Sequence, residues 1–306
     1  MDPVVPNSVL LILGALVLVS MVAWIDILRG LRRGEAIVRH EPHPTVAWGG
    51  AEVLALIVSI FVLQAAARQF TLEYYGLEHD VELAMLGPHV LATLLAANGA
   101  AMLTVLAIGV ALFVGRGARR PRDFGLSLKG RLWLRDAGLA LRAFFVALLP
   151  VYLLQMVLTQ FFPKQHVVLE LIRENHTPAM LAAAAFTVVL AAPLVEEFVF
   201  RLALQGWLET LEERRFARAA QADAEPAGDV PEPIAPLENK RGMVPVVVSS
   251  TVFALLHVGA GAAPVSLFPL ALILGYLYLR TGRLAPCVMT HALFNGFNLG
   301  LLLLSM

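Results

Sequence analysis

Cysteine is nearly absent from this 306-residue chain, since Cys287 is the only one. A single cysteine forms no intrachain disulfide and no thiolate metal cluster, so we expect a small apolar packing residue. Charged residues are also scarce, at 15%, whereas hydrophobic residues make up 58% and the mean hydropathy is +0.75. This profile differs from that of a soluble domain and indicates an all-α, polytopic membrane protein.

Neither sign of charge dominates, because 23 Lys and Arg balance 23 Asp and Glu. Without a basic field, or a basic patch with interleaved aromatic residues, nucleic-acid binding is excluded. The sequence also lacks Gly-x-Ser-x-Gly, a Walker loop and His-Glu-x-x-His, which argues against a serine hydrolase elbow, a nucleotide cradle and an ordinary zincin site. No Lys or Arg precedes the first apolar run, so we expect that run to be a retained anchor rather than a secretory signal peptide.

Eight apolar stretches are candidate membrane spans, because a helix needs about 20 apolar residues to cross a bilayer. They are residues 8–28, 47–67, 83–114, 136–159, 178–208, 243–258, 264–279 and 284–304. The odd-numbered connections between them hold 18 Lys and Arg, and the even-numbered ones hold 3. Because cytoplasmic loops are rich in these residues, we expect both termini outside, in a plasma or inner membrane.

Two connections have a distinctive composition. Residues 219–239 hold too much Pro and charge to pack, and are expected to form a solvated cytoplasmic loop. The basic run 115–135 is interpreted as a cytoplasmic loop, with a short amphipathic segment on anionic headgroups as the alternative. We therefore divide the chain into an N-terminal part, 1–135, and a core, 136–306.

The fifth stretch contains two adjacent carboxylates, Glu196 and Glu197. An ionisable side chain near a bilayer centre costs about 2.5–3.5 kcal/mol on insertion scales, so both should face protein or trapped water. Residues four apart nearly eclipse on a helix, which predicts that Arg201 pairs with Glu197. Glu196 then stays unpaired along the chain and is the candidate general base.

Polar residues also interrupt the later apolar stretches. His257 follows Phe253 by one turn, while His291, Asn295 and Asn298 form a polar stripe along one side of the last stretch. Each alone is compatible with a helix-to-helix hydrogen bond worth about 0.6 kcal/mol. Together with the glutamates, they supply a base, its orienter and oxyanion donors for the attack of water on a carbonyl.

Other ionisable residues receive a plainer interpretation. Six histidines are expected to be solvated or interfacial, namely His40, His43, His79, His89, His166 and His176. Glu52 in the second stretch is expected to be a helix-contact carboxylate, with a second functional site as the alternative.

Three motifs occur in order, Glu196-Glu197-x-x-x-Arg201, Phe253-x-x-x-His257 and His291-x-x-x-Asn295, with Gly275, Thr281-Gly282 and Leu284 before the last. Over residues 178–298 the chain resembles the CPBP family of intramembrane endopeptidases, which includes type II CAAX prenyl endopeptidases and bacteriocin-immunity relatives. The resemblance implies an all-helical membrane fold with its core in the last four or five spans. It also implies that Glu196 and His257 activate water while His291 and Asn295 bind the oxyanion.

The expected function is hydrolysis of a peptide bond in a membrane-associated protein or peptide, from the cytoplasmic side. One alternative is a non-catalytic scaffold or immunity factor that holds a partner in the polar cavity, and another is a proton-coupled transporter. Zn²⁺ could be held by His257, His291 and a carboxylate such as Glu196. Because Asn295 shares a face with His291 and is a poor Zn²⁺ ligand, we expect a metal-free site.

The depths of these residues in the membrane disagree if every span begins at the surface. At 1.5 Å per residue, Glu196 lies about 27 Å from the outer end of its span and His291 about 10 Å from the inner end of its own. Both then fall in the cytoplasmic half, but His257 lies about 21 Å from the start of its helix. We therefore expect the sixth helix to extend into the cytosol.

Overall fold

The computed structural model describes residues 7–118, 120–126, 130–161, 172–173, 176–223, 242–258 and 263–304, and every regular element in them is helical. The longer helices are α1 (Asn7–Arg32), α2 (Gly50–Tyr74), α3 (Pro88–Gly115), α4 (Gly130–Leu158), α8 (Gly206–Asp223), α9 (Val244–Leu255), α10 (Ala263–Thr281) and α11 (Leu284–Leu304). Short 3₁₀ turns, η1 (Leu83–Met85) and η2 (Pro121–Phe124), precede α3 and α4.

One continuous helical run contains the glutamate pair. Its parts are α6 (Pro178–Ala184), the π-helical segment η3 (Ala185–Ala191), α7 (Ala192–Glu197), the π-helical segment η4 (Phe198–Gln205) and α8. π-helical turns are rare and are often found at functional sites. Here they flank the six residues that end with Glu196 and Glu197.

Within the part of the chain that the structure describes, seven helical segments are long and apolar enough to cross a membrane, so the protein is a polytopic helical membrane protein. The sixth expected span is the exception. With 12 residues, α9 is about 18 Å long, short of the ~30 Å hydrocarbon core. The prediction that residues 243–258 cross by themselves is therefore wrong, and α9 instead packs along α10.

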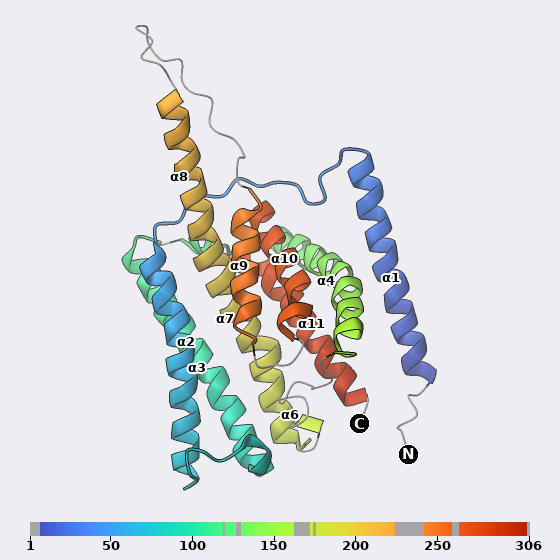
Figure 1. Cartoon of the computed structure of the whole chain (residues 1–306), viewed down its shortest axis with the longest axis vertical. Helices are drawn as coiled ribbons and strands as arrows, with labels where there is room; N and C mark the ends of the chain where they lie inside the picture. Colours follow the sequence, from blue (N-terminus) through green and yellow to red (C-terminus); the bar gives the residue numbers. More distant parts are fainter. Residues whose placement is uncertain are drawn as a thin grey trace.

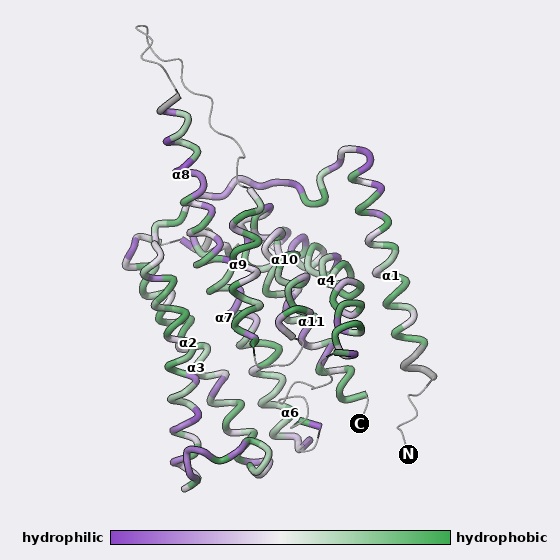
Figure 2. The backbone as a smooth tube through the Cα atoms, in the orientation of Figure 1, coloured by the Kyte–Doolittle hydropathy of each residue, from purple (hydrophilic) through white to green (hydrophobic). Residues whose placement is uncertain are grey.

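The connections that are rich in Lys and Arg gather at one end of the bundle. Those after α1, α3 and α10 lie at the end from which α8 projects, called the α8 end, and the start of α1 and the end of α11 lie at the other (Figure 1). Figure 2 shows hydrophobic residues along the middle of the helices and hydrophilic ones concentrated in the connections at both ends. The expected alternation of the connections is therefore present despite the short α9.

The start of α9 explains the depth of His257. The backbone N–H of Gly242 donates to Glu212 of α8 at 2.6 Å, so α9 starts beside a polar part of the long helical run. Glu212 is 15 residues beyond Glu197, about 22 Å along the helix. His257, at the far end of α9, is thereby brought back to the depth of the glutamates.

The polar connection after α8 starts later than expected. Residues 219–223 continue α8, because the Ala-Ala-Gln-Ala sequence at 219–222 favours helix. The prediction of a loop from residue 219 is wrong for these five residues, and residues 224–239 lie outside the described ranges.

Helix α1 is joined to α4 where a proline interrupts the α4 backbone. Pro150 has no N–H, so it cannot donate to the carbonyl of Val146, and the Trp24 indole donates to that oxygen at 3.0 Å. The Ser20 hydroxyl donates to the neighbouring carbonyl of Phe145 at 2.6 Å. These two bonds attach the N-terminal helix to the core.

Residues 38–48, called the strap, cross the α8 end between α1 and α2 (Figure 1). The backbone N–H of Glu41 donates to the carbonyl of Arg280 at 2.8 Å. The carboxylate of Glu41 also pairs with Arg283, a buried side chain whose second partner is Asp136 at 2.7 Å. The strap therefore holds the turn that leads into α11.

A glycine permits this close contact. Gly282 has φ +59°, and a Cβ atom there would lie 2.4 Å from the Cβ of His43. Only glycine combines this backbone conformation with the space that the strap occupies.

Candidate active site

Glu197 and Arg201 form a fully buried ion pair on η4 and the end of α7. The Arg201 Nε lies 3.0 Å from Glu197 Oε2, which confirms the four-residue spacing prediction. Arg201 also donates through Nη1 to Ser249 on α9 at 2.9 Å, and its guanidinium lies 5.6 Å from the ring centre of Phe253. Because a buried charge is costly without partners, this arrangement holds Arg201 in one orientation.

His291 lies between the two glutamates. Its Nδ1 is 2.8 Å from Glu197 Oε1, and its Nε2 is 3.8 Å from Glu196 Oε2. Since the Arg201 pair keeps Glu197 ionised, that carboxylate can only accept, so His291 Nδ1 is the donor. The contact between His291 and Glu197 is one that the sequence reasoning missed.

Glu196 is the accessible member of the pair. Its side chain is 15% exposed, whereas that of Glu197 is fully buried. Its Oε2 lies 3.8 Å from His291 Nε2, and the ring of Phe253 lies beside the rings of both His291 and His257. The structure therefore brings together the predicted base and both predicted histidines, from α7, α9 and α11.

His257 stands just past the end of α9, with its ring over Phe253 at 4.8 Å between centres. Its Nδ1 lies 2.9 Å from the carbonyl of Phe253, an oxygen that can only accept. In the neutral ring, Nε2 is then free to accept a proton. The Phe253 ring also lies 5.9 Å from the ring of His291, so this buried aromatic residue spaces the two histidines.

The polar stripe on α11 divides between two tasks. Asn295 lies one turn beyond His291, and its Nδ2 donates to the carbonyl of Val188 in η3 at 2.9 Å. Its amide has a second N–H, so a role in oxyanion binding stays a prediction. Asn298 instead accepts from the Tyr152 hydroxyl of α4 at 2.5 Å and serves helix packing.

Three buried polar residues near the site were missed from the sequence. Ser249 contacts Arg201, whereas Gln205 and Glu209 continue the line of residues four apart beyond it. The spacing of Gln205 and Glu209 in an apolar helical run was a usable signal. No such signal marked Ser249, because its neighbour Ser250 is buried as well and the two serines look alike in the sequence.

Most of the residues that were expected to have a structural, solvated or interfacial role have one in the structure. Glu52 caps α2 by accepting from the Gly49 N–H at 2.8 Å and pairs with Arg116, which confirms a helix-contact carboxylate and removes the support for a transporter. Cys287 is fully buried, as expected. His79, His89 and His176 are exposed, while His166 lies outside the described residues.

His43 is a correction to the interpretation of the loop histidines. Its side chain is only 11% exposed, and its Nε2 lies 3.5 Å from Glu209 Oε2. It packs beside Tyr278 and over Gly282, contacts that no local sequence pattern indicates.

The proposed Zn²⁺ ligands do not form a three-ligand site. Within the described ranges, no three His, Cys, Asp or Glu side chains gather so that they could hold one metal ion. We derive no step through a metal.

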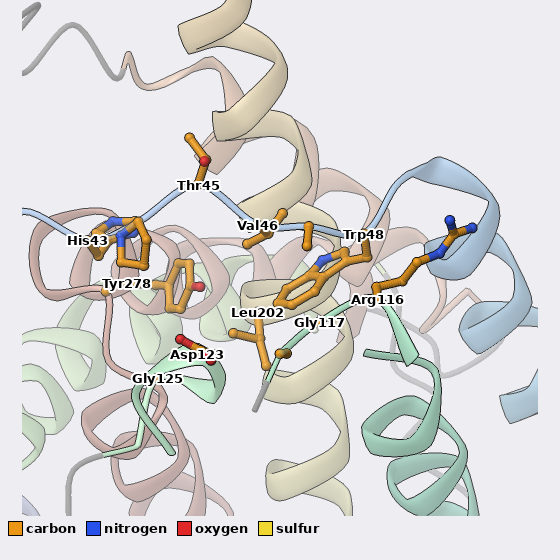
Figure 3. A pocket seen from close by; sticks show the side chains of 14 residues that line it. His43, Thr45, Val46, Trp48, Arg116, Gly117, Asp123, Gly125, Leu202 and Tyr278 are labelled. Atoms are coloured by element: carbon orange, nitrogen blue, oxygen red, sulfur yellow. The ribbon is translucent and has the colours of Figure 1, made fainter. Parts of the chain in front are cut away.

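A cavity of about 200 Å³ lies under the strap (Figure 3). Its walls include His43 and Trp48 of the strap, Arg116, Asp123 and Tyr278. None of the predicted catalytic residues lines it.

A comparison with family models matches residues 178–297 to the type II CAAX prenyl endopeptidase Rce1-like family. This segment starts with α6 and includes the glutamate pair, both site histidines and Asn295. It leaves α1 to α4 outside. Comparisons with curated proteins and with solved structures found no match.

Proposed function

We propose that this chain is an intramembrane endopeptidase with Glu196 as its general base, because residues 178–297 match the Rce1-like type II CAAX prenyl endopeptidase family. The observation that carries the proposal is the asymmetry of the glutamates. Arg201 and His291 hold Glu197, whereas Glu196 is partly exposed and lies 3.8 Å from the Nε2 of His291. This asymmetry divides the pair into a supporting residue and a reactive one.

In the proposed reaction, Glu196 takes up one proton of a water molecule as that water attacks the scissile carbonyl, while the Nε2 of His257 accepts a hydrogen bond from the other O–H of the water. His257 is suited to this because Phe253 occupies its Nδ1. The protonated carboxyl group of Glu196 can then protonate the leaving amine.

The developing oxyanion needs donors that are already oriented. When His291 is protonated, its Nε2–H is such a donor, and the two carboxylates beside it balance the imidazolium charge. The second N–H of Asn295 is the other proposed donor. The contact of Asn295 with Val188 fixes the amide beside His291 on the same face of α11.

The substrate is proposed to be a membrane-associated protein or peptide that reaches the site from the cytoplasm. The basic connections at the α8 end support this orientation, because Lys and Arg are enriched on the cytoplasmic side. We assign residues 136–306 to the catalytic core and residues 1–135 to a supporting part that carries the strap.

Comparison of new protein termini in cells that contain the native protein or Glu196→Gln tests the proposal. We expect a set of termini that is present with the native protein and lost with the variant, at equal amounts of folded protein. Identical termini in both cells would reject the endopeptidase and favour the scaffold that holds a partner in the polar cavity.

A further inference from the structure

The glutamate pair is the inner end of a longer series of buried polar residues. Glu197, Arg201, Gln205 and Glu209 follow one another at four-residue intervals, so their side chains share a face of the helical run. None is more than 1% exposed. We call these four residues the ladder. Four such residues in a membrane protein's interior require partners, since each lost partner is costly there.

Direct contacts join the ladder at both ends. Arg201 pairs with Glu197 at 3.0 Å, and the Gln205 amide donates through Nε2 to Glu209 Oε1 at 2.8 Å. The same Nε2 donates to the carbonyl of Gly275 on α10 at 2.8 Å. Two acceptors, one on α8 and one on α10, thereby fix the orientation of the Gln205 amide.

Gly275 also explains how the two halves meet. A Cβ atom there would lie 3.0 Å from Gln205 Oε1 and 3.5 Å from Arg201 Nη1. The missing side chain lets the Gln205 oxygen and the guanidinium approach the same point of α10. Among the described residues, neither Gln205 Oε1 nor Arg201 Nη2 has a hydrogen-bond partner, so Gln205 and Arg201 meet at Gly275 through proximity and not through a hydrogen bond.

The outer end of the ladder reaches the strap. Glu209 Oε2 lies 3.5 Å from His43 Nε2, and His43 lines the cavity under the strap beside Tyr278 (Figure 3). The hydroxyl of the next residue, Thr210, accepts from the Val46 N–H of the strap at 3.0 Å. Among the described contacts, this hydroxyl has none with the ladder side chains. The strap is therefore attached both through the ladder and beside it.

We propose that Gln205 and Glu209 are positioning residues that hold Arg201, and through it Glu197 and His291, with His43 of the strap anchoring the outer end. This inference rests on the proposed function for its consequence, because His291 is the group that the ladder orients. It assigns a role to the N-terminal part of the chain, which lies outside the family match. Gly275 provides the junction.

The hydrogen bond at His291 Nδ1 gives a test that does not depend on cleavage. In protein labelled with ¹⁵N-histidine, the His291 signal is assigned by its loss in His291→Gln. We expect Gln205→Leu and Glu209→Leu to move the Nδ1 resonance and to abolish the slow exchange of its proton. His43→Ala should move it in the same direction.

Conservative and matched variants separate positioning from loss of structure. Glu209→Gln keeps an acceptor for Gln205, so it should restore the native His291 signal that Glu209→Leu loses. Thr210→Val removes a buried hydroxyl from the same helix and a bond to the strap, and should leave the signal unchanged. An unchanged signal in both leucine variants, or an equal change in Thr210→Val, would overturn the inference.

A turnover measurement then separates this inference from the proposed function. If the native protein generates new termini, Gln205→Leu should lower their rate of formation about 10- to 100-fold, as expected for a displaced catalytic group. If the native protein generates none, the proposed function fails, while the His291 signal still decides whether the ladder positions that residue.

Discussion

The two adjacent glutamates differ only in which side of the helix they occupy, yet their surroundings give them opposite properties. Glu197 accepts from Arg201 and His291, and all three side chains are buried. Glu196 is turned towards the open part of the site. Substitutions at these two positions should therefore have different consequences for stability.

Glu197→Gln is expected to destabilise the protein as well as inactivate it. The variant leaves Arg201 as a buried charge without its counter-ion, and breaking such a pair costs about 3–5 kcal/mol. Glu196→Gln keeps the shape of a side chain that makes no buried ion pair with Arg201, so it should remain folded and lose activity. Thermal unfolding in detergent micelles measures the difference, and equal stability of both variants would contradict the assignment.

Metal removal provides a second test at the residue scale. We expect purified protein to hold less than one Zn²⁺ per chain and to keep its cleavage activity after dialysis against a chelator. Elemental analysis and an assay before and after dialysis measure this. One Zn²⁺ per chain, lost together with activity in His257→Ala, would show that His291 is a ligand instead.

At the scale of the elements, the contact between α1 and α4 depends on a carbonyl that the helix itself does not satisfy. Pro150 leaves the Val146 oxygen without its usual donor, and no lipid can supply one. Trp24 does so from the neighbouring helix. The N-terminal helix is therefore fixed by a local defect in α4.

Trp24→Phe should destabilise the protein by about 1–3 kcal/mol, the cost of leaving a buried carbonyl unsatisfied. In a Pro150→Ala background the cost should be smaller, because the alanine N–H can donate to Val146 within the helix. Unfolding measurements on the single and double variants form the cycle that tests this. Additive effects would show that Trp24 acts by packing alone.

At the scale of the whole molecule, the connections after α1, α3 and α10 lie at one end of the bundle, and the start of α1 and the end of α11 lie at the other. The short α9 does not disturb this order, since the turn after α10 returns to the α8 end, where Gly282 meets the strap. The membrane side of each end follows from charge alone. It can be measured directly, because the native Cys287 is buried.

Single cysteines at Arg218 and Glu78 should react with an impermeant maleimide from opposite sides. Arg218 lies in the projecting part of α8 and should react only from the cytoplasm, while Glu78 lies between α2 and α3 and should react only from outside. Both positions are exposed, so a failure to react would not come from burial. The reverse pattern would place the active site on the outer side.

Local patterns were sufficient for much of this protein. Apolar length predicted the membrane helices, and the spacing of four between Glu197 and Arg201 predicted their ion pair, because one helical turn brings these residues together whatever surrounds them. The same rule applies to Gln205 and Glu209. By contrast, the length of α9 was overestimated, because apolar composition does not show where a helix stops.

Only the tertiary structure placed His291 between the glutamates, His43 against Glu209, and the strap over the turn before α11. The partners in these contacts are 94, 166 and about 240 residues apart, and no periodicity along the chain relates positions at such distances. Their contacts arise from the packing of α7, α11 and the α8 end. Helical geometry determined which residues share a face, and packing decided which faces meet.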